Sequence, residues 1–414
     1  MTETPPKKGS LFVIFLTVFI DLLGFGMVLP LLPIYANQFT VDEAGWQLGL
    51  LMASFSAMQF VFAPLWGRLS DHIGRRPVII IGLIGSVVFY TMFGVATVMK
   101  SLGLLFVSRV GAGIAGATVP TAQAYIADVT SVQNRSRGMA MIGMAFGLGF
   151  TFGPLLGFLA VPDRNSQPGP WPGYAAAILS AIAVLLAIFR LPESRNVEAR
   201  AESRHSVAFR SFLQAMAIPS VCMLLFSIFV CMFSFAEFET TLSLLIKGEK
   251  EASTVGFHFS WGQVCLTYAF IGFTLALIQG GVVRRMATKA SEGALAGAGA
   301  LVQIVGFGTM VVAISQTSVF WLFVSLAIVV AGFSFMQPNL HALVSRRSDP
   351  ARQGMVLGVA QSVNSLARIL GSGMGIPMLK YQIAMPYWAA AVLMAIGAGL
   401  IGLAVRSGRD YRAA

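Results

Sequence analysis

The sequence predicts an all-helical integral membrane protein with twelve transmembrane helices in two halves of six. Three observations lead to this fold class. Hydrophobic residues make up 56% of the 414 residues and charged residues only 11%, whereas soluble proteins carry about 25% charged residues. Apolar runs of about 20 residues, long enough to cross a bilayer as a helix, recur along the chain. Basic residues are concentrated in alternate connections between these runs, which is typical of membrane topology.

Each run must be helical, because irregular backbone cannot face lipid. The predicted spans are 11–35, 46–66, 77–99, 102–126, 138–161, 173–191, 217–246, 255–283, 294–314, 318–343, 353–379 and 384–405. A polar, charged stretch separates the sixth span from the seventh. We therefore expect an N-terminal six-helix bundle over 1–191, a cytoplasmic linker over 192–216 and a C-terminal six-helix bundle over 217–414.

The net charge of +11 reflects topology rather than nucleic-acid binding. With the amino terminus inside, 21 of the 28 Lys and Arg residues fall in cytoplasmic segments and five in outer loops. This excess predicts a multi-pass protein of the cell (inner) membrane with both termini in the cytoplasm. The three cysteines lie in apolar runs without metal-ligand spacing, so we expect structural thiols, no metal and no cofactor.

The connection between the second and third spans contains Gly67, Asp71, Gly74, Arg75 and Arg76. We expect the two glycines to supply backbone freedom where the chain reverses. A solvated basic hairpin loop is one interpretation. The spacing G-x-L-x-D-x-x-G-R-R also resembles the signature loop of the major facilitator superfamily, which implies a conformational gate and two six-helix bundles. By the same resemblance, Asp128 joins Asp71 and Arg75 in an ionic cluster that holds the cytoplasmic face closed.

The two halves repeat weakly at an offset near 214–216 residues. Gln59–Gly67 precedes a basic turn as Ala269–Gly281 does, and Arg137-Gly138-Met139 opens the fifth span as Gln353-Gly354-Met355 opens the eleventh. Parallel repeats of this kind are the architecture of the superfamily. Chance similarity between two basic turns is the alternative.

Asp21 lies about 15 Å into the first span, near mid-membrane, where a carboxylate is costly and suggests function. Arg109 in the fourth span is within reach of it, so a purely structural ion pair is the alternative. Asp21 opens a D-x-x-G-x-G-x-x-x-P-x-x-P run that resembles the helix-1 signature of the drug/proton antiporter branch. This resemblance implies proton coupling through Asp21 and Arg109. Glu237 lies at the repeat position of Asp21, 216 residues further along the chain, and is the next candidate for proton coupling.

The fifth span contains Gly149, Gly153, Pro154 and Gly157. Local reasoning predicts a kinked, tightly packed helix. The G-P-x-x-G cluster also resembles the helix-5 motif of exporters. Other polar residues within spans are candidate substrate contacts, although each could instead hold helices together: Gln123, Glu237, Gln337, Gln361 and Arg368. Two acids in one span, Glu237 and Glu239, indicate a wet cavity, and a position of Glu239 at the outer surface is the alternative.

These observations predict a transporter that exports a small amphipathic compound in exchange for protons. Proton- or sodium-coupled uptake of a nutrient is the close alternative. An enzyme is not expected, since H-E-x-x-H and a suitable G-x-S-x-G are missing. The region from Asp21 to Gly157 resembles tetracycline-type efflux proteins, but the ninth span offers Gln303 and no acid, which argues against tetracycline itself. Expected partners are a small-molecule substrate, protons and lipid, with the protein a monomer.

Overall fold

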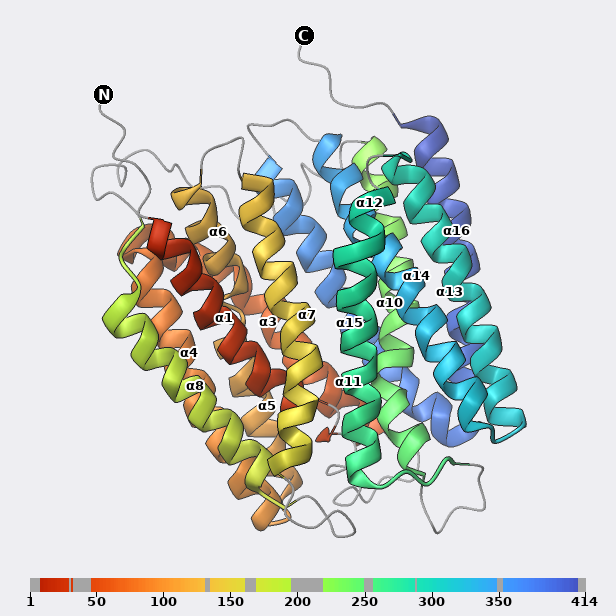
Figure 1. Cartoon of the computed structure of the whole chain (residues 1–414), viewed down its shortest axis with the longest axis horizontal. Coiled ribbons are helices and arrows are strands. Elements are labelled where there is room, and N and C mark those ends of the chain that lie inside the picture. Colours follow the sequence, from red (N-terminus) through yellow and green to blue (C-terminus); the bar gives the residue numbers. More distant parts are fainter. Residues whose placement is uncertain are drawn as a thin grey trace. The chain divides into compact units, whose positions relative to one another are not determined.

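The structure is a computed structural model that describes residues 8–29, 31–32, 46–130, 135–160, 169–194, 219–248, 256–286, 289–347 and 353–408. The regular elements in these ranges are helices, and no strand occurs among them. The helices of the first half are α1 (Lys8–Val28), α3 (Trp46–Ile73), α4 (Arg75–Val98), α5 (Leu102–Gly116), α6 (Val119–Val129), α7 (Arg135–Ala160) and α8 (Trp171–Arg190) (Figure 1).

The second half also consists of helical elements within the described residues. They are α10 (Pro219–Lys247), α11 (Trp261–Leu277), the π-helical η3 (Ile278–Val283), α12 (Arg284–Met286), α13 (Glu292–Ser315), α14 (Val319–Arg346), α15 (Gln353–Tyr381) and α16 (Met385–Ser407). Each of the twelve predicted spans coincides with one helix or with consecutive helical segments. Ten of these helical stretches are long and apolar enough to cross a membrane within the described residues. The other two are α7, whose apolar part is Met144–Ala160, and α15.

The connection between the second and third spans is shorter than predicted. Helix α3 continues through Gly67 to Ile73, and α4 begins at Arg75, so Gly74 alone breaks the helix. Its φ of 108° is a conformation that favours glycine. The expectation that Gly67 also supplies turn flexibility is therefore wrong, because Gly67 is an ordinary helical residue in this structure.

Two other spans contain interruptions that the apolar pattern did not reveal. The fourth span divides into α5 and α6, and Pro120 lies in the first turn of α6, where its missing N–H leaves no helical bond unmade. The eighth span passes into the π-helical turn that contains Gly280 and Gly281. The linker beyond Ser194, up to residue 218, and the predicted end of the first span at 33–35 lie outside the described residues.

The two halves share one internal packing scheme. Helix α1 packs against α7 and α8, and α4 packs against α5 and α8. In the second half α10 packs against α15 and α16, and α13 packs against α14 and α16. These are the same pairs when the spans of each half are numbered from one to six. The packing thus agrees with the weak repeat in the sequence.

The contacts divide the chain into two compact units. Unit 1 contains Met1–Phe39, Ala57–Arg204 and Ser260–Phe273, and unit 2 contains Thr40–Ser56, His205–Phe259 and Thr274–Ala414. The first turns of α3 thus belong to unit 2, where Gly49 lies against Gly373 of α15. The first part of α11 belongs to unit 1, where Gly272 lies against the backbone of Phe150 in α7.

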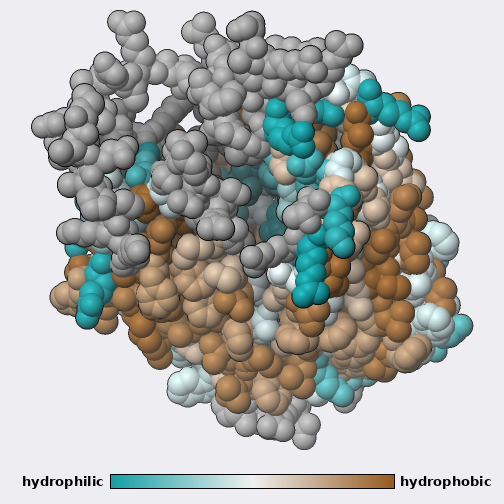
Figure 2. Space-filling model, turned by 45° about the horizontal axis from the view of Figure 1, so that its top comes forward, coloured by the Kyte–Doolittle hydropathy of each residue, from teal (hydrophilic) through white to brown (hydrophobic). Residues whose placement is uncertain are grey.

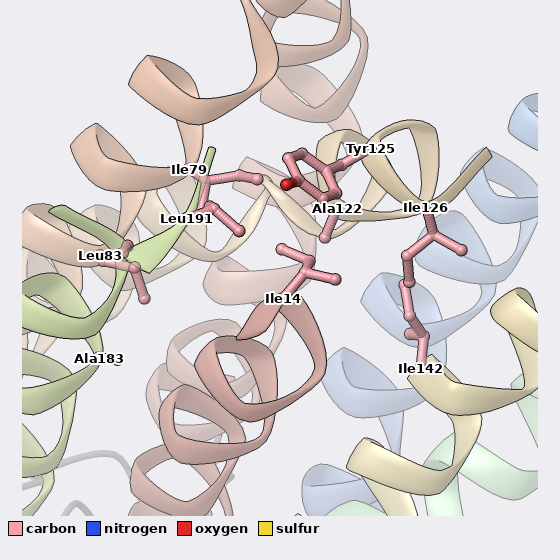
Figure 3. Close-up of a cluster of buried hydrophobic side chains, with 10 residues drawn as sticks. Ile14, Ile79, Leu83, Ala122, Tyr125, Ile126, Ile142, Ala183 and Leu191 are labelled. Atoms are coloured by element: carbon pink, nitrogen blue, oxygen red, sulfur yellow. The ribbon is translucent and has the colours of Figure 1, made fainter. Parts of the chain in front are cut away.

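One end of unit 1 is held by an apolar cluster in which five helices meet. Tyr125 of α6 is fully buried between Ile14 of α1 and Ile79 of α4 (Figure 3). Its hydroxyl donates a hydrogen bond to the carbonyl oxygen of Pro192, at 3.0 Å. Leu191, just after α8, is part of the same cluster. The end of α8 is thereby tied to α4 and α6.

The helix flanks carry many large apolar side chains on their outer surface. Leu159, Phe189 and Phe320 are each more than 70% exposed. Figure 2 shows brown, hydrophobic residues covering the flanks in view, with teal, hydrophilic residues gathered mainly toward the ends of the helices. A soluble protein rarely exposes so much contiguous apolar surface, whereas a lipid-facing surface requires it.

Candidate functional site

Asp21 lies in the middle of α1 and is bonded to the sixth span. The hydroxyl of Ser180 on α8 donates a hydrogen bond to its carboxylate at 3.0 Å, and Ser180 is fully buried. Sequence reasoning did not single out Ser180, because a lone serine in an apolar run is not distinctive. The structure therefore supplies Asp21 with a polar partner inside unit 1.

Arg109 on α5 is also buried in unit 1, at 3% exposure. Tyr90 on α4 is within electrostatic range of both Asp21 and Arg109. Its ring also lies 3.4 Å from the position that a side chain at Gly24 would occupy on α1. Tyr90 thus interacts electrostatically with both predicted coupling residues, while the direct pairing of Asp21 with Arg109 stays a prediction.

The helix-5 glycines hold α7 against the stretch of α1 that carries Asp21. A Cβ atom on Gly149 would lie 2.8 Å from Leu22 Cβ, and one on Gly153 would lie 2.8 Å from three backbone atoms of α1. Gly157 faces Met27 one turn further on, and Pro154 is buried within α7. The motif therefore permits close approach of two helices next to Asp21, as packing through small residues does in membranes.

An ionic cluster joins the ends of α4 and α6 in unit 1. Arg75 Nε lies 3.2 Å from the Asp128 carboxylate, as the gate interpretation predicted. The same carboxylate accepts a hydrogen bond from Ser194 at 3.1 Å, and Arg75 Nη1 donates to Ser70 at 2.6 Å. The side chain of Asp71 lies outside the part of the chain that the structure describes.

The start of α4 is capped by a residue that sequence reasoning missed. The Glu193 carboxylate accepts the backbone N–H groups of Arg75 at 2.9 Å and Arg76 at 3.1 Å. A carboxylate at this place satisfies free N–H groups and interacts favourably with the helix dipole. Glu193 also lies 2.5 Å from where a Cβ on Gly74 would be. The segment after α8 is thus folded back onto the gate motif, and Arg76 donates to the carbonyl of Ile188 on α8.

Unit 2 holds a counterpart of this cluster with the charges exchanged. Arg346 at the end of α14 pairs with Glu292 at the start of α13, at 2.7 Å. Arg347 Nη1 donates to the carbonyl of Ala404 on α16 at 2.8 Å, as Arg76 does to Ile188 in unit 1. Sequence reasoning did not find this pair, because the signature spacing is not repeated there.

Glu237 on α10 is completely buried in unit 2. Among the described residues, neither of its carboxylate oxygens has a hydrogen-bond partner. Gly371 and Gly375 of α15 pack directly against its backbone, and the neighbouring Thr240 is hydrogen-bonded to Ser372 at 2.9 Å. A buried carboxylate without a partner is strongly disfavoured in its charged form.

A second set of polar residues in unit 2 joins α10, α14 and α15. Arg368 Nη2 contacts both carboxylate oxygens of Glu239, at 3.1 and 2.8 Å. Glu239 therefore has an ion-pair partner inside unit 2, and its depth relative to the outer surface stays a prediction. Asn364 lies 3.1 Å from His341 Nε2, which is 3.3 Å from Gln337.

Only some of the predicted substrate-contact residues belong to this second set of polar residues. Arg368 and Gln337 belong to this polar set, Glu237 lies apart from it on α10, and Gln361 is exposed on α15. The side chain of Gln123 lies outside the described residues. His341 was not predicted, and no spacing around it in the sequence marks it.

The chain was compared with known families and structures. The model of the Major Facilitator Superfamily matches residues 14–372. The class C tetracycline resistance protein of Escherichia coli is 30% identical over 367 residues, covering 88% of each chain. Human major facilitator superfamily domain-containing protein 10 is 30% identical over 443 residues, covering 94% of this chain and 89% of that protein. The crystal structure of the human organic anion transporter MFSD10 has a TM-score of 0.74 at 28% identity, covering 96% of this chain and 100% of that chain.

Proposed function

Because the chain belongs to the Major Facilitator Superfamily, a family of membrane transporters, we propose that it exports a small amphipathic compound in exchange for protons. Export would proceed by alternating access between two six-helix bundles. The tetracycline resistance relatives support export as the direction. The observation that carries the proposal is Asp21, a carboxylate at mid-span of α1 that interacts with two neutral hydroxyls, those of Ser180 on α8 and Ser86 on α4.

The Ser180 hydroxyl suits a group that gains and loses a proton. It donates to the Asp21 carboxylate, and the same hydroxyl oxygen can accept a hydrogen bond when Asp21 is protonated. Both protonation states therefore keep a partner in a place where an unpaired polar group is costly. In this proposal Arg109 and Tyr90 influence the electrostatic potential at the Asp21 carboxylate. Glu237 carries a second proton in unit 2.

The ionic cluster of unit 1 serves as the conformational gate in this proposal. The Arg75–Asp128 pair and the Glu193 cap hold α4, α6 and the end of α8 together in unit 1. They would stabilise the state in which the cytoplasmic side is closed. Their loss would shift the population by no more than their interaction energy. In this proposal the protein is a monomer of the inner membrane, and the excess of basic residues in alternate connections supports cytoplasmic chain termini.

The test is proton-driven transport in proteoliposomes. A ligand is first identified by thermal shift of the purified protein with a panel of amphipathic compounds, since only a ligand that prefers the folded state raises its stability. Asp21→Asn, which mimics the protonated form, should abolish transport driven by a proton gradient but retain exchange of labelled for unlabelled substrate. Glu292→Gln, an acid-to-amide change at the start of α13, is the matched control and should keep driven transport.

Proton-driven transport that persists in a folded Asp21→Asn protein would reject Asp21 as the coupling group. The structural ion-pair alternative predicts instead that Asp21→Asn and Arg109→Ala each misfold, while a double apolar replacement recovers activity. Nutrient uptake is distinguished by direction: a symporter accumulates substrate on the side to which protons flow, whereas an antiporter accumulates it on the side from which they flow. Transport of an organic anion is a second candidate, since the solved human relative carries that description and unit 2 has an arginine at mid-span.

A further inference from the structure

We propose that Arg368, with Asn364 beside it, forms a binding site for the carboxylate of an organic anion in unit 2, and that Glu239 occupies this site as a built-in competitor. The inference rests on the proposed transport function. It adds the site, the chemical class of the ligand and the residue that the ligand displaces.

From the depth and exposure of the Arg368–Glu239 pair we infer that it faces water rather than lipid. Arg368 lies 15 residues into α15, hence about 22 Å along the helix, where a charge exposed to lipid is expensive. The two side chains are nevertheless 30% and 19% exposed. Charged residues at this depth face a water-filled cavity or the bundle interior. A solute in such a cavity can therefore reach the guanidinium.

The contact between Arg368 and Glu239 uses only part of the arginine. A single nitrogen, Nη2, contacts both carboxylate oxygens. A guanidinium has five N–H donors in a planar fork, and its strongest pairing with a carboxylate uses two nitrogens in parallel. Within the described residues, Nη1 and Nε take no part in this ion pair. The arginine thus retains an edge that matches a second carboxylate.

Asn364 adds a polar contact one helical turn from Arg368. It lies four residues earlier on α15, so the two side chains share a face about 6 Å apart along the axis. Its amide nitrogen lies 3.1 Å from His341 Nε2. Its side-chain oxygen is buried and has no hydrogen-bond partner among the described residues. Because a buried acceptor is normally satisfied, this oxygen fits a hydroxyl or N–H donor of the ligand.

The charges decide how the ligand enters. Arg368 is neutralised by Glu239 when the site is empty, so an incoming carboxylate meets a like charge. A carboxylate ligand must therefore displace Glu239 from the arginine. The chemistry selects an anion with a hydrogen-bond donor near its carboxylate, and removal of the Glu239 charge should strengthen its binding.

Salicylate and salicylamide are suitable probes, because they differ in charge but share the ring and the ortho hydroxyl. Binding to the purified full chain in nanodiscs is measured by calorimetry. We expect salicylate to bind more tightly than salicylamide, and Glu239→Gln to raise its affinity about tenfold. Arg368→Gln should lower the affinity at least tenfold, and Asn364→Leu should remove the advantage of salicylate over benzoate. Arg346→Gln removes another Arg–Glu pair of unit 2 and should leave binding unchanged.

The proposal is overturned if salicylate binds neither the wild type nor Glu239→Gln, or if Glu239→Gln is folded and binds it more weakly. Equal effects of Arg368→Gln and Arg346→Gln would also overturn it. Should Arg368→Gln fail to fold, two other single variants decide the question. Salicylate should bind more tightly to Glu239→Gln, and more weakly to Arg368→Lys, which keeps the charge but loses the planar fork of donors. Proton-driven export by Asp21→Asn is measured in a separate assay. The proposed proton-coupled export can therefore be rejected while the expected changes in salicylate affinity are still observed, and the binding site can be rejected while proton-coupled export is retained.

Discussion

Two glycine-to-alanine substitutions seven residues apart should change stability in opposite directions. Gly74 has a φ of 108° and a ψ of 160°, a region that only glycine enters easily, at a cost of about 1–3 kcal/mol for other residues. An added Cβ would also lie 2.5 Å from the Glu193 carboxylate. Displacing that carboxylate from the N–H groups of Arg75 and Arg76 removes a helix cap worth about 1 kcal/mol. Gly74→Ala should therefore destabilise the protein by about 2–4 kcal/mol.

Gly67→Ala is the matched control. Gly67 is inside α3, and no atom lies within 4 Å of where its Cβ would be. Alanine is favoured over glycine inside a helix by about 0.5–1 kcal/mol, so this variant should be slightly more stable than the wild type. The same chemical change thus has opposite signs at the two glycines of one signature motif.

Thermal unfolding of the purified protein measures both effects. A change of 1 kcal/mol moves the Tm of a domain of about 200 residues by roughly 2–4 °C, so Gly74→Ala should lower the Tm by roughly 4–16 °C. The reasoning is refuted if Gly74→Ala is as stable as the wild type, or if Gly67→Ala lowers the Tm as much. A Gly67→Ala protein that is stable but inactive would indicate that Gly67 has a close contact in another state of the transport cycle.

Three further predictions concern topology, the gate and helix packing. Arg200→Cys in a variant without native cysteines should resist a membrane-impermeant thiol reagent added to intact cells, and labelling from outside would contradict the twelve-span topology. A double-mutant cycle of Arg75→Gln and Asp128→Asn should give a coupling energy of about 1 kcal/mol in thermal unfolding, since the pair is partly exposed. Additive effects would show that the pair contributes nothing. Gly153→Ala should destabilise the protein because its Cβ would lie 2.8 Å from α1 backbone atoms, whereas Gly147→Ala, with nothing within 4 Å, should not. Equal stabilities of the two variants would contradict the close α1–α7 packing.

The sequence alone determined the membrane class, the twelve spans and the family resemblance. Span length and charge asymmetry are properties of local segments, so they can be read without knowing how the helices pack. Asp21 and Arg109 were found in the same way, because a charge in an apolar run is visible by itself. The pairing of Arg75 with Asp128 was expected from the resemblance to the superfamily, to which the distinctive spacing of the motif around Arg75 points.

Only the tertiary structure decided which polar groups meet. Ser180, Glu193 and His341 have no distinctive neighbours in the sequence, yet they contact Asp21, the start of α4 and Asn364. Their partners lie 159, 118 and 23 residues away along the chain. Which residue of a helix faces which neighbour depends on the rotation and crossing of whole helices, and these are set by packing contacts such as those of Gly149 and Gly153 against α1. Hydropathy does not encode that rotation, so the partners of the charged residues emerge only once the helices are packed.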